Sequence, residues 1–215
     1  MRLVAPVLVL SLLALAAPAH ADTWSSRDRR ADVIGYDTSP PAAEGDCGPP
    51  PRRVRSDARR DLLRLSVDHT SADIVVTLSM RAVSRRDRDT SYEVYLRTPG
   101  GVYSVSVVPG LGKDPGLFEV PTLPQSDPGD DCEGIGLLLL DTGCDGLARE
   151  RDPVADTVTY TIPRDCLDRP AWVRVGAQVY GFLSGEDEGR SDRWGRQGTA
   201  DVGFPPPLGP RVHPS

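Results

Sequence analysis

The sequence contains few of the residues that most catalytic and metal-binding sites require. Histidine occurs three times, and the two copies beyond the first 21 residues, His69 and His213, lie far apart in the sequence. No H-E-x-x-H, C-x-x-C, G-x-S-x-G or G-x-x-x-x-G-K motif is present. Zinc sites, nucleophile elbows and phosphate-binding loops are therefore not expected. Lys113 is the only lysine among 25 basic residues, a bias that indicates a GC-rich genome rather than a function.

The chain also lacks an excess of positive charge. Its formal net charge is −6, and an acidic chain repels phosphate backbones, so we expect no nucleic-acid partner. Two arginine-rich runs, 52–60 (RRVRSDARR) and 84–89 (SRRDRD), interrupt this acidic character. Because both runs are interspersed with aspartate and lie beside expected turns, they are predicted to be solvated loops.

A long hydrophobic run occurs only at the N-terminus. Arg2 precedes an apolar stretch at 3–17, and a small-x-small cleavage site, Ala19-His20-Ala21, follows it. This arrangement is typical of a secretory signal peptide, and the stretch is shorter than the about 20 residues that a membrane span needs. We predict a signal peptide at 1–21, a mature chain that starts near Asp22, and a secreted, extracellular protein without a membrane anchor.

Helical periodicity is nearly absent after the signal peptide, and alternation with a period of two residues takes its place, which predicts β-strands. Strands with one apolar face are expected at 61–69, 72–80, 91–98, 101–109 and 156–163, with an earlier one at 30–37. The run at 134–141 (GIGLLLLD) does not alternate and predicts a strand buried on both sides. The core side of the 61–69 strand is expected to carry Leu63, Leu65 and Val67, and that of the strand after Trp172 is expected to carry Val173, Val175, Ala177 and Val179.

These elements predict an all-β fold, an antiparallel β-sandwich of the jelly-roll or immunoglobulin-like kind with about eight or nine strands. The expected organisation is a signal peptide at 1–21, an early strand and a Pro-rich segment at 22–56, the sandwich core at 57–183, and a Gly/Asp/Pro-rich loop and mobile tail at 184–215. The Pro-rich stretch at 37–56 is expected to cross from one sheet to the other.

Four cysteines, Cys47, Cys132, Cys144 and Cys166, are present. An even number in an exported chain predicts two disulfides. An expected strand separates Cys132 from Cys144 by well over about 20 Å, farther than the about 7 Å between Cα atoms that a disulfide tolerates. A turn and a strand that can fold back separate Cys144 from Cys166. We therefore predict a Cys144–Cys166 disulfide, which leaves Cys47 to pair with Cys132.

One short segment contains the residue types of a hydrolase triad: Asp68, His69 and Ser71. All three fall in or beside one predicted hairpin turn, which cannot present a nucleophile, a base and an orienting carboxylate in the geometry that such catalysis requires. We predict a polar turn with hydrogen bonds from side chains to the backbone instead.

Four segments together, 61–83 (DLLRLSVDHTSADIVVTLSMRAV), 92–101 (YEVYLRTPGG), 144–147 (CDGL) and 156–176 (DTVTYTIPRDCLDRPAWVRVG), resemble a family of small secreted β-proteins from high-GC Gram-positive bacteria. The resemblance implies a secreted β-sandwich and a disulfide that ends at Cys166. It supplies no catalytic residue. The order of strands and aspartates is also distantly similar to carbohydrate-binding modules and DOMON-type sandwiches, which is an analogy of fold alone.

The outer side of the strand after Trp172 is the candidate ligand-binding surface. It carries Trp172, Arg174, Gln178 and Tyr180, and Tyr95 joins them if its strand is a neighbour. Aromatic rings flanked by polar groups are suited to covering the faces of sugars. The alternative is that a Pro-rich segment, 37–56 or 204–210 (FPPPLGP), covers these aromatic side chains.

Acidic loops are the candidates for a cofactor, which is calcium or none. Asp127, Asp130 and Asp131 form one such loop, and 185–192 (GEDEGRSD) forms another, although neither matches the D-x-D-x-D-G pattern. The function we predict is that of a secreted, non-catalytic binding or structural module, extracellular or associated with the cell wall. Binding of a cell-wall or extracellular polysaccharide through the aromatic face is the second hypothesis. A hydrolase that uses an Asp/Glu pair is the third.

Overall fold

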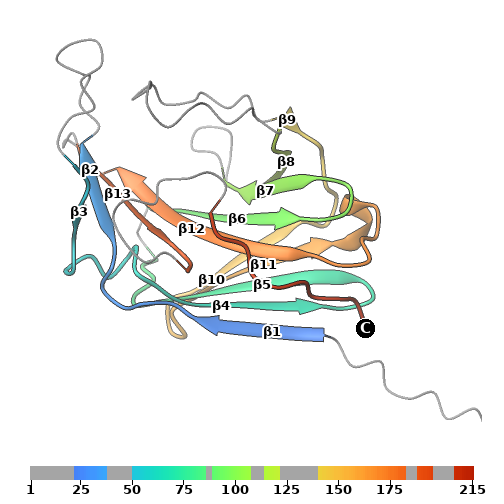
Figure 1. Cartoon of the computed structure of the whole chain (residues 1–215), viewed down its shortest axis with the longest axis horizontal. Helices are drawn as coiled ribbons and strands as arrows, with labels where there is room; N and C mark the ends of the chain where they lie inside the picture. Colours follow the sequence, from blue (N-terminus) through green and yellow to red (C-terminus); the bar gives the residue numbers. More distant parts are fainter. Residues whose placement is uncertain are drawn as a thin grey trace, which may run out of the picture.

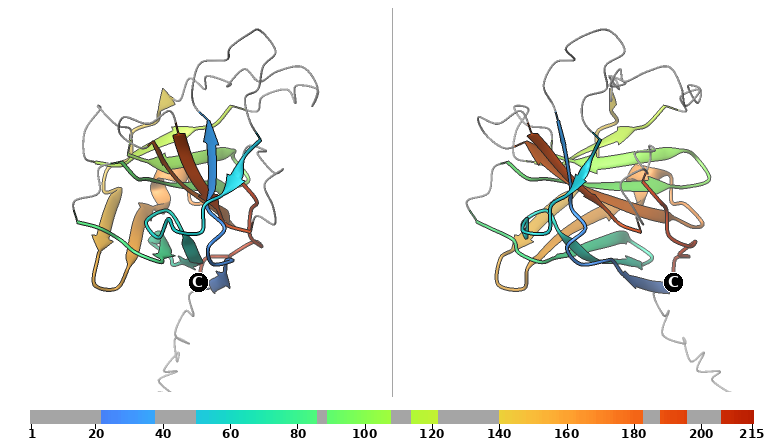
Figure 2. Two further views of the ribbon diagram at one scale, coloured as in Figure 1. Left: turned by 90° about the vertical axis from the view of Figure 1, so that its left-hand side faces the viewer. Right: turned by 60° about the vertical axis from the view of Figure 1, so that its left-hand side comes forward.

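Two antiparallel β-sheets pack face to face in the computed structural model (Figures 1 and 2), which describes residues 22–37, 50–85, 89–107, 114–121, 140–182, 188–195 and 206–215. The first sheet has five strands in the order β1–β4–β5–β11–β10, and the second has eight in the order β3–β2–β13–β12–β6–β7–β8–β9. The predicted all-β antiparallel sandwich is confirmed. The described residues hold thirteen strands rather than eight or nine, because several short, polar strands were not expected.

The strands are two to nine residues long. The first sheet contains β1 (Asp22–Arg27), β4 (Leu62–His69), β5 (Asp73–Met80), β11 (Thr157–Pro163) and β10 (Ala148–Asp152). The second sheet contains β3 (Arg52–Arg53), β2 (Ile34–Asp37), β13 (Glu188–Arg193), β12 (Arg174–Phe182), β6 (Ser91–Arg97), β7 (Val102–Ser106), β8 (Gly116–Glu119) and β9 (Leu140–Asp141). A single turn of 3-10 helix, η1 (Arg164–Leu167), follows β11.

Side chains from the facing sides of the two sheets form one hydrophobic core. The central strands alternate as the sequence predicts, so β5 and β11 each bury every second residue. The four expected core residues, Val173 just before β12 and Val175, Ala177 and Val179 on it, are all at most 1% exposed. Burial of alternating apolar side chains on both inner faces is the main stabilising contribution of a sandwich of this kind.

The start of β4 departs from the predicted alternation. A bulge between Leu62 and Arg64 shifts the register with β5. Leu62 is therefore fully buried, whereas Leu63, which was expected on the core side with Leu65 and Val67, is only half-buried. An extra residue in one strand reverses the side-chain alternation on one side of the bulge, which the pattern of apolar residues alone does not reveal.

Two segments cross between the sheets at the same end of the sandwich: residues 28–33 between β1 and β2, and residues 54–61 between β3 and β4 (Figure 1). They lie side by side, because the Val54 amide donates to the Val33 carbonyl over 2.7 Å. The crossing predicted within 37–56 occurs after β3 instead. The strands β2 and β3 are neighbours in the second sheet, with Gly35 opposite Arg52, so the chain has not yet crossed when it reaches β3.

The C-terminal part belongs to the sandwich, so the predicted boundary at residue 183 is too early. β13 is an inner strand between β2 and β12. Residues 206–215, the C-terminal segment, continue along β12 where β13 has ended: Gly209 donates to the Val175 carbonyl, and Val212 and Val173 exchange two backbone hydrogen bonds. The prediction of a mobile tail is therefore wrong for residues 206–215.

A disulfide joins Cys144 to Cys166 with the Cα atoms 5.4 Å apart, which confirms that predicted pair. It ties the turn before β10 to η1. Cys47 and Cys132, the second predicted pair, lie outside the described residues, and so does the predicted signal peptide at 1–21. Among the residues that the structure describes, no helix has the length and apolar character that a membrane crossing would require.

Candidate functional site

The predicted ligand-binding residues share the outer face of the second sheet. Arg174, Gln178 and Tyr180 alternate along β12, and Tyr95 lies on the adjacent strand β6, opposite Gly176. Trp172 lies two residues before β12 and is half-buried. The structure thus brings these residues together on neighbouring strands, as expected from the sequence.

The C-terminal segment covers one end of this face. Arg174 donates from Nε to the Gly209 carbonyl over 2.8 Å and from Nη2 to the Leu208 carbonyl over 3.0 Å. A Cβ atom on Gly176 would come within 2.5 Å of the Pro207 carbonyl, so only glycine permits this close approach. The guanidinium carbon of Arg211 lies 4.4 Å from the centre of the Trp172 ring, a cation–π contact.

The middle of the face is buried rather than open. Tyr95 is 2% exposed and Glu93 is 7% exposed. Burial raises the pKa of Glu93, although the Ser104 hydroxyl donates a hydrogen bond to its Oε1. Burial, together with the nearby charge of Glu93, also raises the pKa of Tyr180 to about 12. A flat, exposed aromatic platform is therefore not formed by these residues.

An open hollow of about 400 Å³ adjoins the covered end of the face. It is lined by Arg174, Trp194, Leu208, Gly209, Pro210 and Arg211. The Trp194 ring packs edge-on against Trp24 of β1, with ring centres 5.1 Å apart, and the Trp194 Nε1 group is buried without a hydrogen-bond partner. Two arginines and a tryptophan thus contribute, with the C-terminal segment, to a concave surface beside β12.

A second polar site, which the sequence did not predict, lies where the two crossing segments meet β13. We call Asp28, Asp32, Asp61 and Asp192 the acidic cluster. Asp28 and Asp32 belong to the first crossing segment, Asp61 ends the second, and Asp192 lies on β13. One carboxylate oxygen from each of Asp32, Asp61 and Asp192 lies within 4.8 Å of the other two. Asp32, Asp61 and Asp192 are at most 6% exposed.

Backbone amides hold three of the four carboxylates in place. Asp61 accepts hydrogen bonds from the Ala31 amide at 3.0 and 2.9 Å, and Ala31 adopts a left-handed backbone conformation with φ of 62°. Asp192 accepts from the Leu62 amide at 2.8 Å and from the Arg193 amide at 2.9 Å. Asp28 Oδ1 accepts from the amides of Arg29 and Gly195.

Burial and mutual repulsion act against ionisation in the acidic cluster. Burial, reinforced by the neighbouring aspartates, raises the pKa of Asp28 to about 7. Burial likewise raises the pKa of Asp32 and Asp61, and it raises the pKa of Asp192 well above its usual range. Carboxylates this close need either a proton or a cation to share the site.

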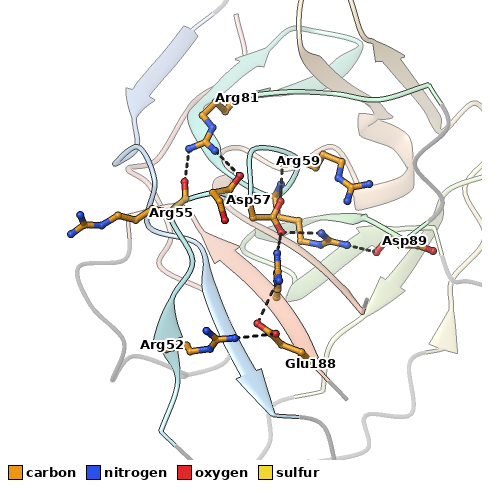
Figure 3. Close-up of polar contacts among 10 residues, drawn as sticks. Arg52, Arg55, Asp57, Arg59, Arg81, Asp89 and Glu188 are labelled. Carbon is orange, nitrogen blue, oxygen red and sulfur yellow. Dashed lines mark hydrogen bonds and ion pairs between the residues drawn. The ribbon is translucent and has the colours of Figure 1, made fainter. Parts of the chain in front are cut away.

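An arginine–carboxylate network borders the acidic cluster (Figure 3). Arg81 of this network pairs with Asp61 at 2.8 Å and also donates to the Arg55 carbonyl. Arg60 is fully buried and pairs with Asp57 at 2.9 Å. The prediction that 52–60 is a solvated loop is therefore wrong for Asp57 and Arg60, which lie in the interior as a matched pair.

The other predicted polar sites have different outcomes. Asp127, Asp130 and Asp131, the predicted calcium residues, lie outside the described residues. Asp192, from the second acidic loop, belongs to the acidic cluster instead. His69 ends β4, is fully buried and donates from Nδ1 to the Val212 carbonyl at 3.0 Å. Ser71 is exposed in the following turn, where Thr70 makes hydrogen bonds with the backbone.

Comparisons with family models, curated proteins and solved structures return no significant match.

Proposed function

We propose that the protein is a secreted, non-catalytic binding module that acts outside the cell and contacts its ligand at the hollow beside β12 and at the adjacent Trp172 ring. The observation that carries this proposal is the hollow itself, which is lined by Arg174, Arg211 and Trp194 together with the C-terminal segment. Concave surfaces that combine an apolar wall with a few convergent polar groups are the usual form of a ligand site.

The burial of the grouped carboxylates supports a non-catalytic role. A glycosidase needs two carboxyl groups that face a bound sugar from opposite sides of a cleft. In the described part of the chain, Asp61 is fully buried and Asp192 is 1% exposed, so neither presents its carboxylate to a substrate. The third hypothesis, a hydrolase with an Asp/Glu pair, therefore receives no support from the acidic cluster.

A cell-wall or extracellular polysaccharide is the ligand class that we propose. Trp172, beside the hollow, is half-buried, and the exposed Arg211 side chain covers one face of its ring. A cation–π contact at an exposed site is worth only about 0.5–1 kcal/mol. A sugar ring can therefore displace Arg211 from Trp172 at small cost and stack on the indole in its place.

The test is co-sedimentation of the purified protein with insoluble cell-wall polysaccharide and with peptidoglycan. The Trp172→Ala variant is expected to lose more than about tenfold in affinity, because a central aromatic contact commonly dominates binding energy. Phe182→Ala is the matched control, since Phe182 is a 56% exposed aromatic residue at the opposite end of β12. The Phe182→Ala variant is expected to co-sediment with the polysaccharide as strongly as the wild type does.

Two results would contradict the proposal. One is that no wall preparation retains the wild-type protein. The other is that Trp172→Ala and Phe182→Ala bind equally well, which would place the contact elsewhere on the surface.

A further inference from the structure

The acidic cluster carries an inference that goes beyond the proposed binding function. Its carboxylates come from three parts of the chain, namely 28–33, Asp61 and Asp192, and they converge at one point between the sheets. Oxygens of Asp32, Asp61 and Asp192 that lie within 4.8 Å of one another can all reach a single ion, because calcium–oxygen distances are about 2.3–2.6 Å.

Among the described residues, arginines balance the charges of the cluster only in part, since Arg29, Arg30 and Arg53 act without a direct ion pair. Four aspartates contribute up to four negative charges at this point. Within the described part of the chain, one ion pair offsets them, that of Asp61 with Arg81. Burying unpaired charge is costly, so these carboxylates must share either a proton or a cation, and a divalent cation offsets more of their charge than a single proton does.

Two carboxylate oxygens of the cluster have no hydrogen-bond partner. Asp32 Oδ1 is buried and has no hydrogen-bond partner. Asp32 as a whole is only 6% exposed, and an oxygen of its carboxylate lies near those of Asp61 and Asp192. Asp28 Oδ2 is also buried and unpartnered. Buried polar atoms are rarely left unsatisfied, so the Asp32 oxygen, in the group that converges, is positioned as a ligand rather than as an acceptor of a hydrogen bond.

The donor set selects the ion. All the side-chain donors are carboxylate oxygens, which suit hard cations and not zinc or copper. Calcium accepts six to eight oxygen ligands in an irregular cage, whereas magnesium retains several waters and demands a regular octahedron. Backbone amides already fix the carboxylates of Asp61 and Asp192, so the cage is preorganised.

We propose that Asp32, Asp61 and Asp192 bind one calcium ion that fastens the two crossing segments to β13, and that Asp28 adds a nearby negative charge to the site. Each carboxylate retains lone pairs beyond those that accept the amide hydrogen bonds, so coordination leaves the existing contacts in place. The ion joins the first sheet, which begins its β4 strand directly after Asp61, to the second sheet through β13. Calcium sites of extracellular modules with EF-hand loops have dissociation constants of about 10⁻⁴–10⁻³ M, which is the range we expect here.

The test compares thermal unfolding of the purified protein in EDTA and in 10 mM calcium at matched ionic strength. We expect the wild-type midpoint to rise by about 3–10 °C with calcium. Terbium, which replaces calcium in oxygen cages, is expected to luminesce on excitation of tryptophan, because Trp194 lies two residues from Asp192.

The decisive variant is Asp32→Asn, which removes one charge and keeps the shape of the side chain. In EDTA it should be at least as stable as the wild type, because it relieves repulsion, so a failure to fold cannot explain its result. We expect it to lose the calcium shift and more than about tenfold in calcium affinity by calorimetry. Asp145→Asn, which removes an exposed charge in the turn before β10, is the matched control and should behave as the wild type.

Several outcomes would overturn the proposal. The wild-type midpoint would be the same in calcium and in EDTA, or Asp32→Asn would keep the full calcium shift. A shift that survives Asp32→Asn and disappears in Asp130→Asn would place the ion in the acidic loop at 127–131. An equal shift with 10 mM magnesium would contradict the choice of calcium.

Discussion

At the scale of single residues, the buried pair of Asp57 and Arg60 shows how this protein tolerates charge in its interior. The pair lies at 2.9 Å with side chains that are at most 3% exposed. Burial raises the pKa of Asp57, but the charge and hydrogen bonds of Arg60 outweigh it and hold the pKa below its usual range. Gly181 leaves room for Arg60, because a Cβ atom there would come within 2.7 Å of its Nε.

Asp57→Asn is expected to destabilise the protein by about 3–5 kcal/mol, because it leaves the buried Arg60 charge without its partner. Urea unfolding followed by tryptophan fluorescence measures the loss. Arg52→Gln is the control in the same network, since its side chain is 72% exposed where it pairs with Glu188. That change should cost less than about 1 kcal/mol. Equal effects of the two substitutions would show that burial does not decide the strength of these pairs.

His69 is the residue that should give the C-terminal segment a pH dependence. Burial lowers its pKa from 6.5 despite its hydrogen bond to Val212, and Arg164 and His213 act in the same direction as burial while Asp22 opposes it. Because the folded pKa is depressed, the unfolded chain binds more protons below about pH 6.5. The contribution of His69 to the free energy of unfolding is therefore complete above that pH, and it is lost as the pH falls towards the pKa of His69 in the folded protein.

We expect the unfolding free energy of the wild type to fall more steeply between pH 7.5 and 5.5 than that of His69→Gln, a variant that cannot titrate. The protection factor of the Val212 amide, which is bonded to Val173, should fall in the wild type as the pH is lowered over the same interval. Parallel pH profiles for the two proteins would exclude His69 as the responsible group.

At the scale of elements, the Cys144–Cys166 disulfide holds the turn before β10 against η1. The two cysteines are 22 residues apart in the sequence, and closing a loop of this length restricts the unfolded chain. Replacing both by serine should lower the free energy of unfolding by about 3 kcal/mol, as measured in urea under non-reducing conditions. A change of less than about 1 kcal/mol would show that η1 holds its place without the covalent link.

The elements that could be predicted are those with a long apolar alternation. β5 and β11 follow the sequence pattern closely, because each buries every second side chain in one core, whereas β6 and β12 also bury residues of their outer faces. β10 (ARERD) and β3 (RR) carry no apolar alternation, so their pairing with β11 and β2 depends on neighbours that the local sequence does not specify. β13 was missed for the same reason, since its inward-facing residues include Asp192 rather than an apolar side chain.

At the scale of the whole molecule, the candidate sites depend on contacts between distant parts of the chain. Sequence alternation placed Arg174, Gln178 and Tyr180 on one face of β12, but it could not show that residues 206–215 lie along the same strand. The acidic cluster joins Asp28 to Asp192 across most of the described chain. The available signal was local: Asp32 and Asp61 each stand directly before two apolar residues in the sequence. These aspartates come together only because the two crossing segments lie side by side in the fold, which the local sequence does not specify.

The claim that unites these observations is that the sandwich is fastened by an ion where its two crossing segments meet. The most direct measurement is an anomalous difference map from crystals of the protein grown in calcium. The account predicts one peak at about 2.3–2.6 Å from the carboxylate oxygens of Asp32, Asp61 and Asp192. A map from such crystals without a peak at this point would contradict it.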